Sequence, residues 1–228
     1  MFIDIHTHPP VDKLNPAELQ KVFESGLYNK SSCLCFLNII PGMFVEDVQL
    51  PVQIRLSTGI HPWRARDEVN PEKLRAVFSA DAISLIGEIG LDKKAVVDFK
   101  LQLEVFECQL KLAAAYHKPV LIHTVGSMSE MLALKEKYSE IPAWIIHGFR
   151  GKAIQAAQWI NHGCYLSFGM NYNAEALQSC PADKLFLETD VSGISIEQVY
   201  NRAARTRVCS VAALENQLEK NMFGLFMQ

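Results

Sequence analysis

The chain has 228 residues, which is enough for one sizeable hydrophobic core and is the usual size of a single α/β barrel domain. Hydrophobic residues make up 49% of the chain and charged residues 21%, as is ordinary for a soluble globular protein. The formal net charge of −3 excludes a protein that grips duplex nucleic acid by overall basic charge, so a phosphate-bearing substrate would need local positive charge or a bound metal.

The first residues contain no basic stretch followed by an apolar run, so we expect no signal peptide. No window approaches the ~18 apolar residues that are needed to span a bilayer. The six cysteines form no Cys-x-x-Cys pair, and buried reduced thiols are the default in such a chain. We therefore expect a cytoplasmic protein with no membrane association and no obligate protein partner.

Short apolar runs, rich in β-branched residues, recur along the chain, and most are followed by a helical pattern. Several of these runs are continuously apolar, as expected for parallel strands that are covered on both faces. The sequence predicts eight strands: Phe2–His6, Cys33–Ile39, Arg55–Gly59, Ser84–Glu88, Val120–His123, Trp144–His147, Tyr165–Phe168 and Leu185–Glu188.

The helices between these runs have recognisable ends. Asn15-Pro16 and Asn70-Pro71 each give an N-cap followed by proline at the first helical position, and Gly26 ends the first of these helices. Prolines at 41 and 51, without a helical period between them, indicate that the helix after the second strand is missing or irregular. The remaining predicted helices are 72–78, 98–116, 127–138, 152–161, 195–205 and about 211–220.

Eight strands that alternate with helices over this length favour an α/β fold, a (β/α)₈ TIM barrel. An open doubly wound sheet is the alternative that the pattern leaves. No short repeat, low-complexity tract or long linker interrupts the chain, so we expect residues 1–228 to form a single domain.

Metal-binding residue types occur at the ends of the predicted strands, where catalytic groups of such a barrel lie. Residues two apart on a strand point the same way, so His6 and His8 can reach into one site. The full set comprises His6, His8, Glu88, His123, His147 and Asp190.

A lone histidine at a strand end is more often a satisfied hydrogen-bonding residue than a metal ligand, but six such residues on one face favour a metal site. Four imidazoles and two carboxylates exceed the three or four protein ligands of a single catalytic zinc. Two metals that share a carboxylate would use them all, and Glu88 is the natural bridge. This interpretation requires Glu88 to lie within a side chain's length of His123 and Asp190.

His117 and His162 are different, because both stand at predicted helix C-termini. There the helix dipole and the free carbonyls account for a histidine without catalysis. We exclude both from the predicted site.

Six segments resemble the TatD family of metal-dependent deoxyribonucleases, within the amidohydrolase superfamily. They run in family order: Phe2–His8, Gly59–Pro62, Ile86–Asp92, Pro119–His123, His147–Gly151 and Leu187–Asp190. The resemblance implies that a first metal is held by His6, His8 and Asp190, and that Glu88 bridges both metals. A second metal would be held by His123 and His147. The resemblance also implies that His61 lies beside the substrate phosphate.

The chain departs from the family pattern at two places near the predicted site. After His123 it carries Thr124-Val125-Gly126, where the family usually has an arginine–acid pair. After Asp190 it runs through Val191-Ser192-Gly193 into a helix, where the family usually has a proline-rich loop. These departures concern the surroundings of the scissile bond rather than the metal ligands.

The expected function is that of a divalent-metal-dependent hydrolase, a TatD-like phosphodiesterase or deoxyribonuclease that acts on DNA ends or single strands. Two divalent ions (Zn, Mg or Mn) would activate water. Asp190 would take the proton of that water and return it to the leaving group, and Glu88 would complete the catalytic pair. Arg150 is a candidate phosphate ligand, and Trp63 either stacks on a base or packs under its loop.

Two alternatives remain. Related barrels hydrolyse amides or lactones, or deaminate bases, and the fold does not exclude such bonds. The chain could also be a non-catalytic, metal-dependent binding module, although its intact ligand set speaks against this.

Overall fold

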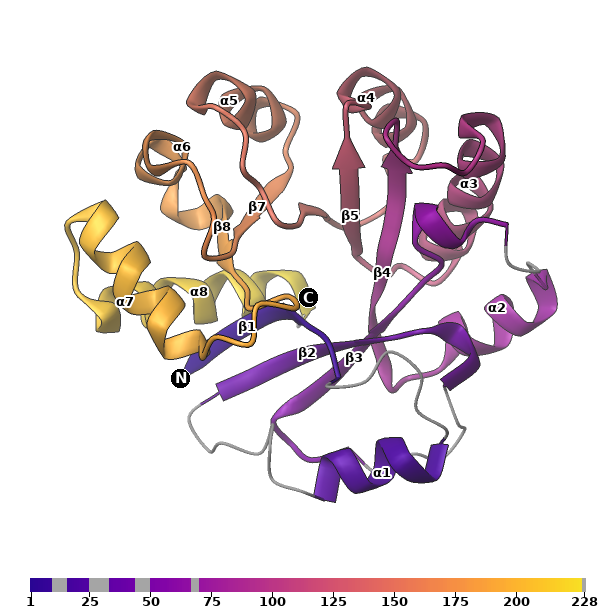
Figure 1. Ribbon diagram of the computed structural model, residues 1–228, viewed down its shortest axis with the longest axis horizontal. Helices are drawn as coiled ribbons and strands as arrows, with labels where there is room; N and C mark the ends of the chain where they lie inside the picture. The colour runs from indigo at the N-terminus through magenta and orange to yellow at the C-terminus, as the bar shows by residue number, and fades with distance from the viewer. Residues whose placement is uncertain (10–15, 25–32, 44–49, 67–69, 227–228) are drawn as a thin grey trace.

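The computed structural model describes residues 1–9, 16–24, 33–43, 50–66 and 70–226 (Figure 1). The predicted N-cap Asn15 and the predicted helix end Gly26 lie outside the described residues. Eight parallel strands form one sheet whose spatial order is the order of the chain. They are β1 (Phe2–Thr7), β2 (Cys33–Ile39), β3 (Ile54–Thr58), β4 (Ile83–Asp92), β5 (Val120–Val125), β6 (Trp144–Ile146), β7 (Tyr165–Phe168) and β8 (Leu185–Leu187).

The sheet curls until its first and last strands meet. Thr7 at the end of β1 forms an isolated parallel bridge with Asp190, just beyond β8. The backbone N–H of Asp190 donates to the carbonyl of His6 at 2.9 Å. The result is a nearly closed barrel, so the predicted (β/α)₈ TIM barrel is confirmed and the open doubly wound sheet is wrong.

Helices surround the outside of the sheet (Figure 1). The side chain of Asn70 caps α2 by accepting from two backbone N–H groups, as predicted. Ser195 opens α7 with a capping box. The α-helices are α1 (Pro16–Glu24), α2 (Pro71–Ser79), α3 (Phe99–Ala115), α4 (Met128–Lys137), α5 (Ala153–Asn161), α6 (Ala174–Ser179), α7 (Ile196–Arg207) and α8 (Val211–Phe226). Three 3₁₀ turns are η1 (Pro41–Met43), η2 (Pro62–Arg64) and η3 (Ala182–Lys184).

Most boundaries differ from the sequence prediction by one or two residues, whereas β4 and α8, which ends at Phe226, run further than predicted. β4 does not end at Glu88 but continues to Asp92, because residues 89–92 pair with β5, which itself runs two residues past His123. Glycine and aspartate are poor strand formers, so this extension was hidden in the sequence. Helix α6 was not predicted; it begins where the side chain of Asn173 accepts from the backbone N–H of Ala176.

The connection between β2 and β3 agrees with its two prolines. Its described residues contain only the 3₁₀ turn η1 and no α-helix, while residues 44–49 lie outside the described part of the chain.

The start of β1 is fixed from outside the barrel by α7. The hydroxyl of Tyr200, fully buried, accepts from the backbone N–H of Ile3 at 3.0 Å and donates to the Ile3 carbonyl at 3.1 Å. The ring of Tyr200 lies edge-on to Phe2, and α8 also packs against β1. Burial of each large apolar side chain here stabilises the fold by about 1.5–3 kcal/mol.

None of the helices in the described ranges is both long and apolar enough to cross a membrane. The cytoplasmic location stays a prediction.

Candidate metal centre

Two of the predicted ligands occupy irregular positions in their strands. The pairing of β1 with β2 changes register across His6, and the pairing of β4 with β5 changes register across Glu88. Such a bulge sets one extra residue into a strand and re-aims a side chain, often beside an active site. The two bulges bring His6 and Glu88 to the same mouth of the barrel, where their side chains approach each other to 3.5 Å.

Glu88 is the centre of the cluster, and it is only 7% exposed. Its Oε1 lies 2.7 Å from Nε2 of His147, 2.8 Å from Nδ1 of His123 and 3.2 Å from Nε2 of His61. Its Oε2 lies 3.5 Å from Nε2 of His6. One buried carboxylate therefore faces four imidazoles from four different segments.

His6, His8 and Asp190 form a second group at the barrel seam. The Nε2 atoms of the two histidines are 3.1 Å apart, and they lie 3.6 Å and 3.5 Å from Oδ1 of Asp190. Two ring nitrogens this close cannot both direct lone pairs at each other without a proton or a cation between them. The donor set of imidazole nitrogens and carboxylate oxygens fits a divalent metal.

The charges of the cluster support the same interpretation. Burial alone would lower the pKa of His6, but hydrogen bonds to Asp190 and Glu88 raise it to about 9. Burial lowers the pKa of His8 to about 4, helped by repulsion from His6. Burial would raise the pKa of Glu88, but attraction to His147 and hydrogen bonds from the surrounding histidines hold it well below its usual range. The carboxylate of Glu88 therefore stays ionised because positive charge surrounds it. Bound cations could supply such positive charge.

His61 faces the cluster as a hydrogen-bond donor. Its Nδ1 accepts from the backbone N–H of Trp63 at 3.1 Å, so in the neutral ring the proton is on Nε2. That N–H points at Glu88 from 3.2 Å. The arrangement suits an anionic group better than a cation, although His61 is one member of the side-chain sets that could hold a metal. Those sets are His6/His8/Asp190, His6/Glu88/His147, His61/Glu88/His123 and His147/Glu188/Asp190.

Two further predicted site residues lie at the edge of this cluster. Trp63 is 62% exposed, so its ring does not pack under its loop; it lies edge-on to His61 with ring centres 4.9 Å apart. Arg150 is exposed, three residues after His147, and is not among the described side chains that meet around Glu88. His117 and His162, which we had excluded, lie exposed at the ends of α3 and α5.

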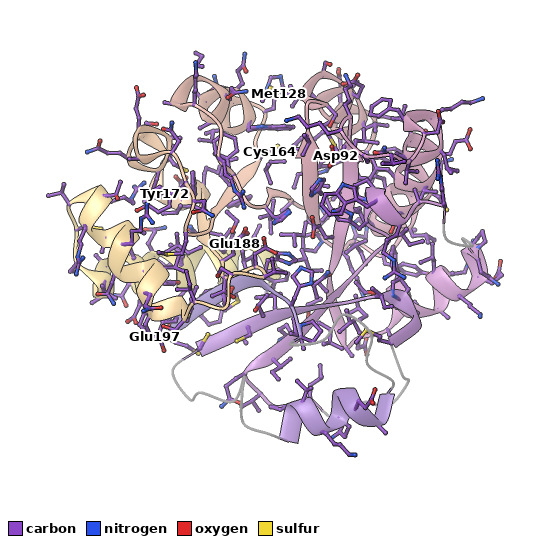
Figure 2. All side chains as sticks on the ribbon, viewed as in Figure 1. Asp92, Met128, Cys164, Tyr172, Glu188 and Glu197 are labelled. Atoms are coloured by element: carbon purple, nitrogen blue, oxygen red, sulfur yellow. The ribbon has the colours of Figure 1, made fainter. Side chains whose placement is uncertain are left out.

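Glu188 is a buried carboxylate that sequence reasoning missed. Its Oε1 accepts from the backbone N–H of Gly148 at 2.7 Å and lies 3.3 Å from Nδ1 of His147. Its Oε2 is buried and has no hydrogen-bond partner among the described residues. Glu188 lies near the middle of the molecule in Figure 2.

Asp92 and Asp4 were also missed. Asp92 accepts from Nε1 of Trp63 at 2.7 Å and lies 3.2 Å from Nε2 of His123; in Figure 2 it lies beside β4 and β5. Asp4 accepts from the backbone N–H and the hydroxyl of Thr189, at 3.0 Å and 2.7 Å, and so anchors the residue before Asp190. The available signal was a carboxylate inside an apolar strand, which costs free energy unless it is hydrogen-bonded.

Comparison with known proteins gives consistent results. The chain matches the family described as TatD related DNase over residues 3–227. It is similar to the metal-dependent hydrolase YcfH of Escherichia coli K12, with 28% identity over 206 residues that cover 83% of this chain and 77% of the relative. It is also similar to the 3′-5′ ssDNA/RNA exonuclease TatD of Cronobacter turicensis, with 32% identity over 147 residues, 59% of this chain and 56% of the relative.

The fold has a counterpart among solved structures. The crystal structure of YJJV, a TatD homologue from Escherichia coli K12, superimposes with a TM-score of 0.80 and covers 100% of this chain and 98% of its own. Sequence identity in that superposition is 20%, so the likeness concerns the fold.

Proposed function

The chain belongs to the TatD-related DNase family of metal-dependent hydrolases, and from this premise we propose that residues 1–228 form one catalytic barrel domain that hydrolyses phosphodiester bonds. The observation that carries the proposal is the position of Glu88, whose two oxygens face histidines of both side-chain groups. A carboxylate in that position is suited to be shared by two cations.

We infer that a first cation would be held by His6, His8 and Asp190 and a second by His123 and His147, with Glu88 available to both. Imidazole nitrogens favour Zn²⁺ and carboxylate oxygens favour Mn²⁺ or Mg²⁺. When bound, such cations supply Lewis acidity, which makes water a nucleophile near neutral pH and offsets charge on phosphoryl oxygens.

Asp190 is the proposed proton acceptor. Its carboxylate is 25% exposed, so it faces both the cluster and incoming water and substrate. Burial would raise its pKa, but hydrogen bonding and attraction to His6 hold the pKa below its usual range, which keeps the carboxylate ionised at neutral pH. It can therefore take a proton from water and return it to the leaving oxygen.

The proposed substrate is a DNA end or a single strand. His61 would donate its Nε2 proton to a phosphate oxygen, and Arg150 would supply positive charge that the chain as a whole lacks. The exposed ring of Trp63 offers a stacking surface for a base, a contact worth about 1–3 kcal/mol in proteins that bind single strands. The name of the Cronobacter turicensis relative, a single-strand exonuclease, supports this substrate class.

The proposal is tested by metal analysis followed by hydrolysis on the same sample. We expect two equivalents of metal per chain and shortening of an end-labelled single-stranded oligonucleotide. A chelator should remove the metal and abolish the shortening. Asp190→Asn is the informative variant, because asparagine tolerates the left-handed backbone of Asp190, φ 52°. We expect it to fold and to turn over roughly 10²–10⁴ times more slowly.

Three results would contradict the proposal. Near-normal turnover by Asp190→Asn would remove that residue from proton transfer. Hydrolysis of cyclic amides or lactones without hydrolysis of bis-p-nitrophenyl phosphate would show that the chain acts on a bond other than a phosphodiester. Binding of the oligonucleotide without shortening, with Zn²⁺, Mn²⁺ or Mg²⁺ present, would make the chain a binding module.

A further inference from the structure

Asp92 lies between the candidate metal centre and the exposed Trp63, and the mechanism above gives it no part. Its side chain is 4% exposed. Oδ2 lies 2.7 Å from Nε1 of Trp63 and 3.2 Å from Nε2 of His123, and Oδ1 accepts from the backbone N–H of Lys94 at 2.8 Å. Three groups from three segments therefore meet on this one buried carboxylate.

The backbone of Asp92 is held just as firmly. The side-chain amide of Gln102, on α3, accepts from the N–H of Asp92 at 2.8 Å and donates to its carbonyl at 3.1 Å. The same amide donates to the carbonyl of Val97 at 2.8 Å. These contacts fix the backbone that carries the carboxylate.

His123 stands between two carboxylates, with one ring nitrogen toward each. Nδ1 lies 2.8 Å from Oε1 of Glu88, and Nε2 lies 3.2 Å from Oδ2 of Asp92. An ionised carboxylate only accepts, so a nitrogen that hydrogen-bonds to Asp92 must carry a proton. Glu88 is an acceptor as well, so these two contacts alone do not select the tautomer. A ring that gives its Nδ1 lone pair to a cation, however, keeps its one N–H at Nε2, where Asp92 accepts it.

His147 provides the comparison, because it is turned the other way. Its Nε2 lies toward Oε1 of Glu88 and its Nδ1 toward Glu188. The two histidines thus present opposite ring nitrogens to the same oxygen, and each has a buried carboxylate behind it. Such an outer carboxylate orients a ligating histidine and selects its tautomer.

We propose that Asp92 is a positioning residue, which holds His123 in the Nε2–H tautomer so that Nδ1 is the atom available to a cation. The same carboxylate oxygen holds the indole edge of Trp63, which keeps the exposed ring beside that ligand. The carboxylate of Asp92 therefore positions both the histidine that would bind a cation and the ring on which a base would stack. The inference rests on the proposed function in its use of His123 as a metal ligand.

The first test is Zn²⁺ affinity of the full chain by calorimetry. Asp92→Asn places an amide –NH₂ group either against the two donors at Oδ2 or against Lys94 N–H, and we expect a 10- to 100-fold loss of affinity at one site. Asp98→Asn is the matched control, since asparagine also caps α3, and it should bind Zn²⁺ as the wild type does. Unchanged affinity in Asp92→Asn overturns the proposal.

Trp63→Phe tests whether the carboxylate of Asp92 or the indole of Trp63 is responsible for the effect on Zn²⁺ affinity. It removes the N–H donor and keeps Asp92 and an aromatic ring, so we expect near-wild-type Zn²⁺ affinity and weaker binding of a single-stranded oligonucleotide. A loss of Zn²⁺ affinity as large as that of Asp92→Asn would locate the effect in the indole and overturn the role of Asp92.

The second test needs no folded variant. In the ¹⁵N-labelled wild type, two-bond ¹H–¹⁵N correlations report which ring nitrogen of a neutral histidine bears the proton. In the Zn²⁺-loaded protein we expect Nε2–H for His123, and a proton on Nδ1 overturns the proposal. A different variant tests the proposed function itself. Unchanged Zn²⁺ affinity in His123→Ala would show that His123 is not a metal ligand, whereas a proton on Nδ1 would refute the role of Asp92.

Discussion

Gly90 should be the residue of β4 whose replacement by alanine costs the most stability. It lies opposite His123 in the β4–β5 ladder, with φ 150°, a conformation that L side chains rarely adopt. A Cβ atom at this position would lie 1.9 Å from the carbonyl oxygen of His123 and 2.8 Å from its carbonyl carbon. Both atoms belong to the backbone, so no rotamer change can relieve the contact, and the two strands would have to separate.

The cost of Gly90→Ala follows from these two effects. Overpacking a tight interior costs about 1–3 kcal/mol, and a residue forced into a disfavoured backbone conformation costs about 1–3 kcal/mol more. A contact of 1.9 Å places the variant toward the upper end, about 4 kcal/mol or more. A chain of this size loses roughly 2–4 °C of Tm per kcal/mol, so we expect a fall of about 8–16 °C.

Two other glycines separate the causes in the same thermal denaturation experiment. Gly193→Ala meets nothing within 4 Å but has φ 67°, so it tests the backbone conformation alone, at about 1–2 kcal/mol. Gly42→Ala has open space and no left-handed φ, and should melt with the wild type. The reasoning is refuted if Gly90→Ala melts together with Gly193→Ala. Since the displaced strands carry Glu88 and His123, any folded Gly90→Ala protein should also bind Zn²⁺ more weakly.

Two further predictions concern metal binding. Glu188→Gln removes the charge behind His147, so Zn²⁺ affinity measured by calorimetry should fall 10- to 100-fold. The exposed control Glu175→Gln should leave the affinity unchanged. Equal affinities of the two variants would argue against an orienting role of Glu188. Zn²⁺ affinity should also rise with pH, because the pKa of His6 is raised to about 9 and the metal must displace that proton. Between pH 6.5 and 9 we expect about a tenfold gain per pH unit for each proton displaced, measured by competition with a chromophoric chelator. A flat profile would contradict this.

The strands could be predicted because parallel strands covered on both faces are continuous apolar runs, as in Val120–Ile122 and Leu185–Leu187. The side chains that meet around Glu88 could be anticipated for a related reason: in a barrel, the ends of such runs come to one face. Helix starts at Asn70-Pro71 and Ser195 were local signals and needed no tertiary information.

The buried carboxylates could not be read from the sequence in the same way. Asp92 and Glu188 have their histidine partners 31 and 41 residues away, so their roles depend on strand register and ring orientation. The extension of β4 that carries Asp92 exists only because β5 lies alongside it. Helix α6 was missed because six residues are too few to show a helical period.

The contact between β1 and Asp190 joins two segments that are synthesised at different times. His6 and His8 leave the ribosome well before Asp190, and only once Asp190 has emerged can its backbone N–H donate to the carbonyl of His6. Until Asp190 has emerged, a growing chain carries the two histidines without this carboxylate. The candidate active centre is completed in the same step that closes the barrel, so a partly made chain cannot hold the complete set of ligands.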